Sequence, residues 1–120
     1  WMLWESSAWF PSAYVYLVEN VVKPLLKAEP DQGILNAQDE NFHKLASILD
    51  ARLAKTPWLC GNSVTIADIA VAAPMHLHTF QKLPLDRHPN LKRWMTERVE
   101  KLPSWKKTDA APFLGFPAMY

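Results

Sequence analysis

The four histidines are the residues with the most versatile chemistry in this sequence. His76 and His78 stand two positions apart, and two neighbouring imidazoles suggest a metal site. On a helix, however, side chains two positions apart point about 200° away from each other, so this pair cannot close one tetrahedral site. His43 and His88 show no ligand-like spacing to each other. We therefore expect no metal ion to be bound by this chain.

The candidate nucleophiles are equally unpromising. Cys60 is the single cysteine and cannot form a disulfide within the chain. It stands in an apolar loop before a predicted helix, so we expect it to be buried and inert. Ser6 and Ser7 lack the Gly-x-Ser-x-Gly elbow that exposes a nucleophilic serine. The sequence therefore predicts no catalytic residue within these 120 residues.

Aromatic and polarisable side chains give a better indication of a binding site. They gather in two places, which are Trp4, Trp9, Phe10 and Tyr14 near the start of the chain, and Met75, His76 and Thr79 after Pro74. These residues could form a wall for a hydrophobic substrate. Core packing, or an interface with another domain, is the structural alternative and stays open at this point.

The element that must position these residues is a predicted central helix after Thr65. Thr65 and Asp68 have the spacing of a capping box, in which each side chain bonds the backbone of the other residue. Val64 and Ile69 stand at the positions of a hydrophobic staple. Residues 69–73 are apolar on every face, which predicts a helix buried all round. Capping explains Thr65 and Asp68 without any catalytic role.

Two amphipathic helices are predicted before the central helix. The first spans about residues 4–26, with Pro11 expected to kink it. Its apolar stripe comprises Tyr14, Leu17, Val18, Val21, Val22 and Leu25. The second spans about residues 34–54. Its stripe comprises Leu35, Phe42, Leu45, Ala46, Leu49 and Leu53.

Prolines divide the chain after the central helix. Pro74 should kink that helix and change its direction, which could open a pocket. Pro89 suits the first position of another helix, which carries Trp94, and Trp105 lies in a short turn after Pro103. Trp94 and Trp105 are expected in the core. Residues 113–120 are predicted to form an ordered tail laid on the surface.

Length and charge narrow the class of protein. The chain has 120 residues, enough for one domain with its own core. Its net charge is +1 with acids and bases interspersed, which argues against a nucleic-acid or anionic-membrane partner. No apolar run is long enough to span a membrane and no basic segment resembles a secretion signal, so we expect a cytoplasmic protein. Because the chain opens on Trp1 inside a helical pattern, we also expect a segment before it.

Three motifs together resemble one family. They are W-L-x-G-x-x-x-T-I-A-D from Trp58 to Asp68, H-P-N-L from His88 to Leu91, and L-P-x-W from Leu102 to Trp105. This combination is similar to the C-terminal helical domain of glutathione S-transferases, and the resemblance covers nearly the whole chain. It implies an all-α bundle of five or six helices around a central, buried, capped helix.

The resemblance also implies what residues 1–120 lack. A thioredoxin-like N-terminal domain would bind glutathione, the co-substrate, and carry the catalytic Tyr, Ser or Cys. The helical domain would supply the hydrophobic wall for a small electrophile, from its first helix, its central helix and its tail, and the full-length protein would be a homodimer. No cofactor is expected on this chain alone, which should not conjugate glutathione by itself.

A helical interaction module is the alternative function. The same domain type occurs in translation-factor and tRNA-synthetase assemblies, where it would expose an apolar patch to protein partners. A basic stripe for RNA would favour this alternative. The pairs Lys92-Arg93 and Lys106-Lys107 are too short to form one.

Overall fold

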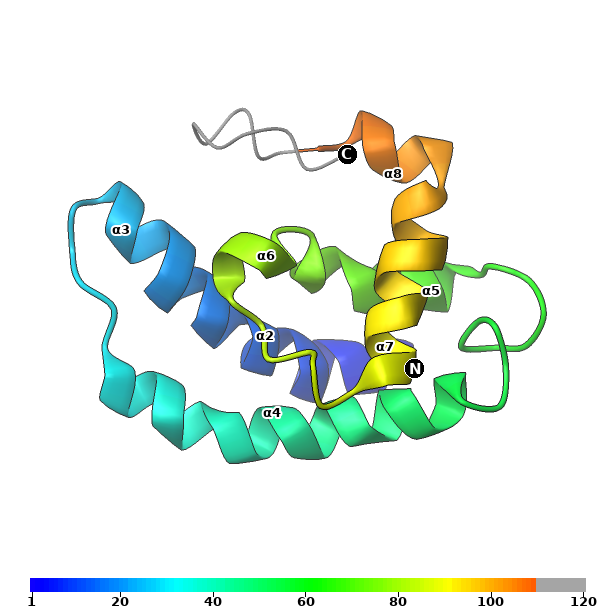
Figure 1. Ribbon diagram of the computed structural model, residues 1–120, viewed down its shortest axis with the longest axis horizontal. Helices are drawn as coiled ribbons and strands as arrows, with labels where there is room; N and C mark the ends of the chain where they lie inside the picture. The colour runs from blue at the N-terminus through cyan, green and yellow to red at the C-terminus, as the bar shows by residue number, and fades with distance from the viewer. Residues whose placement is uncertain (110–120) are drawn as a thin grey trace.

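The computed structural model describes residues 1–109, which form six helical segments (Figure 1). The first is one continuous rod made of α1 (Met2–Trp4), η1 (Glu5–Trp9), α2 (Phe10–Leu17), η2 (Val18–Val22) and α3 (Lys23–Leu25). The others are α4 (Gln32–Leu53), α5 (Ile66–Ala72) with η3 (Ala73–Met75), α6 (His78–Gln81), α7 (Pro89–Arg93) with η4 (Trp94–Arg98) and η5 (Val99–Lys101), and α8 (Pro103–Lys107). The all-α prediction is confirmed. The predicted tail, residues 113–120, lies outside the described residues.

The first rod continues through both of its prolines. Pro11 and Pro24 each follow a wide π-helical turn, η1 and η2. The amides of Phe10 and Lys23, directly before each proline, donate to the carbonyl five residues earlier. A proline has no amide proton and its ring crowds the turn before it, so a wider turn accommodates it. The expected disturbance at Pro11 is therefore a π turn within a continuous helix.

The buried face of this rod differs from the predicted stripe. The buried residues are Trp9, Ser12, Ala13, Tyr16, Glu19 and Val21. Tyr14, Val22 and Leu25 were predicted to be buried and are exposed. Each π turn holds one more residue than an α turn and so rotates the side chains that follow it about the helix axis. A constant period of 3.6 residues therefore misplaced Tyr14, Val22 and Leu25, whereas Val21 is buried as predicted.

Polar residues on this buried face have partners on α4. Ser12 accepts a hydrogen bond from Gln38, and Glu19 accepts from the Asp31 amide at 3.1 Å. Asp31 is in turn the N-cap of α4, because its carboxylate accepts from the amides of Gly33 and Ile34. Glu19 and Asp31 together hold the start of α4 against the first rod.

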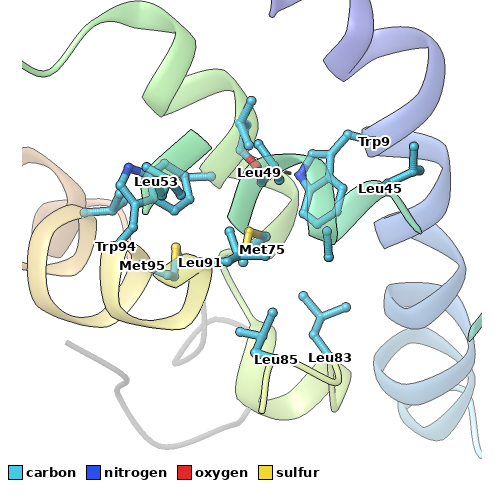
Figure 2. Close-up of a cluster of buried hydrophobic side chains, with 14 of the residues drawn as sticks. Trp9, Leu45, Leu49, Leu53, Met75, Leu83, Leu85, Leu91, Trp94 and Met95 are labelled. Carbon is cyan, nitrogen blue, oxygen red and sulfur yellow. Dashed lines mark hydrogen bonds between the residues drawn. The ribbon is translucent and has the colours of Figure 1, made fainter. Parts of the chain in front are cut away.

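The apolar face of α4 matches the prediction at every position. Its buried residues are Leu35, Phe42, Leu45, Ala46, Leu49 and Leu53. They form the core with Trp9, Met75, Leu91 and Trp94, which come from the other helices (Figure 2). The indole nitrogen of Trp9 donates to the Val71 carbonyl at 2.9 Å, so α5 is also tied to the first rod.

Asp68 joins three parts of the chain. It is fully buried, and its carboxylate accepts from the Leu59 amide at 2.9 Å, the Thr65 amide at 3.0 Å and the Trp94 indole at 3.1 Å. The bond from the Thr65 amide is the reach-back half of a capping box at the start of α5. The other two bonds hold the preceding loop and η4 against α5.

The prediction that α5 is buried all round is wrong. Ala67, Val71 and Ala72 are buried, whereas Ile66 is 73% exposed and Ile69 39% exposed. Val64, the expected staple partner of Ile69, is also exposed. Apolar composition shows that a face can be buried but not whether a neighbour covers it. One apolar face of α5 is therefore bare within residues 1–109.

A residue of α4 caps α7, which the sequence did not predict. Asp50 Oδ1 accepts from the amides of Asn90 at 2.8 Å and Leu91 at 3.0 Å. The first amides of a helix have no partner within it, so a carboxylate there stabilises the helix. Asp50 thereby holds the start of α7 against α4.

We predict that Asp68→Ala lowers the free energy of unfolding by about 3 kcal/mol, because it leaves buried amide and indole donors unpaired. Urea denaturation followed by circular dichroism measures this. Asp86→Ala is the matched control, since Asp86 is an exposed carboxylate that pairs with Lys92 on the surface. Similar small effects of the two substitutions would contradict the structural role of Asp68.

Candidate functional site

A cavity of about 580 Å³ lies between α2, the α5 to α6 region and α8. Its apolar wall is formed by Phe10, Leu17, Ile69, Ala73, Pro74 and Leu77. Its polar groups belong to His76, Gln81, Ser104 and Thr108, and Trp105 completes the lining. Figure 1 shows that these elements come from the start, middle and end of the described chain. The size and the mostly apolar lining are those of a small-molecule pocket.

Helical spacing brings the wall residues together. Phe10 and Leu17 stand seven residues apart on α2, and Ile69 and Ala73 stand four apart along α5 and η3, so each pair shares one face. Pro74 then replaces the α-helix by the single 3₁₀ turn Ala73–Met75. The disturbance expected at Pro74 is therefore a 3₁₀ turn beside the cavity.

Gln81 closes the cavity between α6 and α2. Its side chain is 1% exposed, and its amide nitrogen donates to the carbonyls of Pro74 at 3.1 Å and Ala13 at 3.4 Å. These bonds hold the chain direction after the Pro74 turn. The carbonyl oxygen Oε1 of Gln81 is buried and has no donor among the described residues.

His76 brings a titratable group into this apolar surface. Its ring packs on Trp105 with centroids 5.2 Å apart, and Nε2 lies 3.9 Å from a carboxylate oxygen of Asp109. Burial lowers the pKa of His76, while the carboxylates of Asp109 and Glu100 act in the opposite direction. The imidazole is therefore neutral at pH 7.

His76 and His78 differ in their direct contacts. His78 Nε2 contacts the Glu100 carboxylate at 2.5 Å, whereas His76 faces the cavity and Trp105. Within residues 1–109, no cluster of three or more His, Cys, Asp or Glu side chains is arranged to hold a metal ion.

The cavity contains two of the seven residues predicted for the substrate wall, Phe10 and His76. Tyr14 is exposed and stacks on Phe10, with ring centroids 5.7 Å apart. Thr79 is exposed as well and does not reach the cavity.

The other predicted wall residues belong to the core. Trp9 and Met75 are fully buried, and Trp4 stacks on Trp9 with centroids 5.8 Å apart. These side chains therefore pack in or against the hydrophobic core and do not line the cavity. The reason is their helical phase, since Trp9 directly precedes Phe10 and points about 100° away from it.

The sequence analysis missed most of the cavity lining. Leu17 could have been found as the residue seven positions after Phe10, and Ala73 as the residue four positions after Ile69. No local signal marks Gln81 or Trp105, because their distance to these helices depends on the tertiary fold. Trp105 is buried, as predicted, and also lines the cavity.

Comparison with known proteins identifies the family. Residues 14–103 match the family described as "Glutathione S-transferase, C-terminal domain". The chain belongs to this family.

Plant and bacterial transferases are among the similar proteins. Glutathione S-transferase 3 of Zea mays is 30% identical over 115 residues, which cover 92% of this chain and 51% of the relative. GstB of Escherichia coli (strain K12) is 34% identical over 85 residues, covering 70% of this chain and 40% of the relative. A solved structure of glutathione S-transferase III in apo form superimposes with a TM-score of 0.81 at 30% identity, covering 98% of this chain and 54% of that one. The chain thus spans about half the length of these transferases.

Cys60 is exposed, so the expectation of a buried cysteine is wrong. It lies in a tight turn between Trp58 and Gly61, which bridge each other through their backbones. Gly61 has φ +134°, a conformation that side chains disfavour. The turn buries Leu59 completely and leaves its neighbour Cys60 outside. Cys60 does not line the cavity.

A pair of histidines links α4 to the start of α7. His43 Nδ1 and His88 Nε2 are 2.8 Å apart, so one ring donates to the other and at least one must be neutral. Burial, with a smaller contribution from His43, lowers the pKa of the His88 imidazole, while the Asp50 carboxylate acts in the opposite direction.

No helix in the described part of the chain is long and apolar enough to cross a membrane.

We predict that the free energy of unfolding falls as the pH is lowered from 7.5 to 5.5. The native pKa of His88 lies below its ordinary 6.5, so the unfolded chain binds protons first and stability is lost as the pH falls. His88→Gln should make the decline shallower, and His76, whose pKa is also lowered, should account for part of the remainder. Urea denaturation at several pH values measures this. An unchanged slope in His88→Gln would contradict it.

Proposed function

We propose that this domain supplies the hydrophobic electrophile site of a glutathione transferase. The observation that carries the proposal is the apolar cavity of about 580 Å³ between α2, α5 and α8. Family membership supports this proposal. The relatives are about twice as long as this chain, which supports a second domain that binds glutathione. We further propose that the complete protein is a cytoplasmic homodimer with a thioredoxin-like domain of its own.

The cavity would act by binding and orientation. An apolar wall removes water from the electrophile and holds its reactive carbon near the sulfur of glutathione, which lowers the entropic part of the barrier. The thiolate is the attacking species, so the other domain must lower the pKa of the thiol. A Tyr, Ser or Cys of that domain would do so. The described residues of this chain then need no nucleophile of their own.

The bare apolar face of α5 is the proposed contact with the second domain. Ile66 and Ile69 lie exposed on α5, and Ile69 also reaches the cavity. Phe10 and Tyr14 extend the exposed apolar surface onto α2. A domain docked there would bury this surface and bring glutathione to the edge of the cavity.

The same bare face also fits the alternative function, a helical module that binds protein partners in a translation-factor or synthetase assembly. Retention of the complete gene product on immobilised glutathione, together with turnover of an aryl halide, tests the choice. Retention with turnover supports the transferase. A complete protein that folds but neither binds glutathione nor conjugates the aryl halide would favour the interaction module.

We predict that Ala73→Trp weakens binding of the neutral fluorescent probe N-phenyl-1-naphthylamine to the 120-residue chain at least about tenfold, because the indole occupies part of the cavity that the probe needs. Ala73 is exposed and lines the cavity, so the larger side chain should not disturb the core. Ile48→Trp is the control, since Ile48 is exposed on α4 and does not line the cavity. Equal probe affinity in the two variants would show that the cavity is not the binding site.

A further inference from the structure

We propose that a second, polar cavity of this chain binds a small zwitterion of the free amino acid class. The cavity has a volume of about 230 Å³ and lies where the first rod, the first half of α4 and the segment after α6 meet (Figure 1). This volume is below the roughly 300 Å³ at which pockets for drug-sized ligands begin, so it suits a small molecule. The two cavities share no lining residue, and the proposal does not depend on the proposed function.

Asp39 supplies the negative end of the site. It lies half-buried on α4, and its Oδ1 accepts a hydrogen bond from the hydroxyl of Tyr16, which is 3% exposed. Burial raises the pKa of Tyr16, and the bond to Asp39 raises it further, so the hydroxyl keeps its proton. The other carboxylate oxygen, Oδ2, has no partner among the described residues. It is therefore available to accept from a ligand ammonium group.

Lys82 supplies the positive end. It directly follows α6 in a left-handed conformation, with φ 56°. The Asn20 side chain donates to the carbonyl of the preceding residue, Gln81, at 2.6 Å, and so holds this part of the backbone against the first rod. Within residues 1–109, the Lys82 ammonium makes no hydrogen bond or ion pair. Its three donors are therefore available to a ligand carboxylate.

The two charges line one cavity without pairing with each other. Asp39 comes from α4 and Lys82 from the segment after α6, and no ion pair joins them among the described residues. A ligand that carries an ammonium and a carboxylate can satisfy both groups at once. An amine or an acid alone satisfies one of them and is repelled by the other. The charge pattern therefore favours a zwitterion over either singly charged ligand.

The rest of the lining fits the uncharged part of an amino acid. Leu35, Pro30 and Pro84 provide an apolar surface, and the amides of Gln32 and Asn36 can donate or accept hydrogen bonds. Pro30 and Pro84 stand in the two connecting segments beside the cavity, where their rings restrict the backbone. A wall that is already ordered loses little entropy when a ligand binds.

Three ligands that differ only in charge test the proposal. L-leucine, N-acetyl-L-leucine and L-leucinamide are each titrated into the isotope-labelled 120-residue chain and followed by nitrogen–proton NMR. L-leucine should bind with a Kd of about 1 mM, and each derivative at least about tenfold more weakly, because each lacks one charge. The side-chain amides of Asn20 and Asn36 and the backbone amide of Lys82 should shift. The amides of Ala73 and Leu77, which line the larger cavity, should not.

Two variants each remove one charge. Asp39→Asn keeps an acceptor for the Tyr16 hydroxyl, and should weaken L-leucine about tenfold without weakening N-acetyl-L-leucine, which has no ammonium group. Lys82→Gln should weaken L-leucine by a similar factor without weakening L-leucinamide, which has no carboxylate. A loss of structure would weaken every ligand, so these differences report the charges themselves.

Matched controls lie next to each variant or share its backbone conformation. Glu40→Gln removes the exposed carboxylate beside Asp39, and Lys27→Gln removes an exposed lysine that also has a left-handed conformation, with φ 61°. Neither residue lines the polar cavity. Both controls should bind L-leucine as the wild type does.

Several outcomes would overturn the proposal. They are the absence of shifts at about 20 mM L-leucine, well above the expected Kd, and equal affinity for the three ligands. Losses in Asp39→Asn and Lys82→Gln no larger than those in the controls would do the same. Shifts confined to Ala73 and Leu77 would place the ligand in the larger cavity and also contradict the proposal. The naphthylamine probe tests the larger cavity separately, so failure of one site is distinguishable from failure of the other.

Discussion

The structure depends on the hydrogen bonds of one buried carboxylate. Asp68 accepts from the start of its own helix, from the loop before it through Leu59, and from Trp94 on η4. A charge in the interior is costly unless its oxygens are paired, and here both oxygens accept from donors that would otherwise be unpaired themselves. The position of α5 is set in this way, and α5 carries Ile69 into the cavity. The hydrogen bonds of Asp68 thus help to position one wall of the candidate site.

Two prolines also influence the shape of the cavity, because each stands beside a turn that departs from the α-helix. Pro11 follows the π turn η1, which sets the face that Phe10 and Leu17 present. Pro74 ends the regular part of α5 and brings His76 to the cavity. Gln81 then bonds the Pro74 carbonyl and holds the turn. Most of the apolar wall therefore stands on helices, which suits a site whose proposed role is to orient a ligand.

The buried face was predicted correctly for α4, which is a regular helix packed against the core on one side. Every predicted buried position of α4, from Leu35 to Leu53, is buried, because nothing interrupts its 3.6-residue period. The prediction failed for part of the first rod, where Tyr14 is exposed and Ser12 is buried, because π turns shift the phase, although Val21 is buried as predicted. It also failed for Ile66, which is apolar yet exposed. Periodicity identifies a helix and its repeat, but it does not show which neighbours are present.

The sequence by itself determined the family, the all-α class, the start of α5 and the core face of α4. These depend on spacings within a few turns of chain, where local geometry fixes which groups meet. Only the tertiary structure decided that Asp50 caps α7, that His43 meets His88, and that Gln81 bonds the Ala13 carbonyl. These partners stand 40, 45 and 68 residues apart. No local spacing encodes such contacts, because they exist only once the helices have packed.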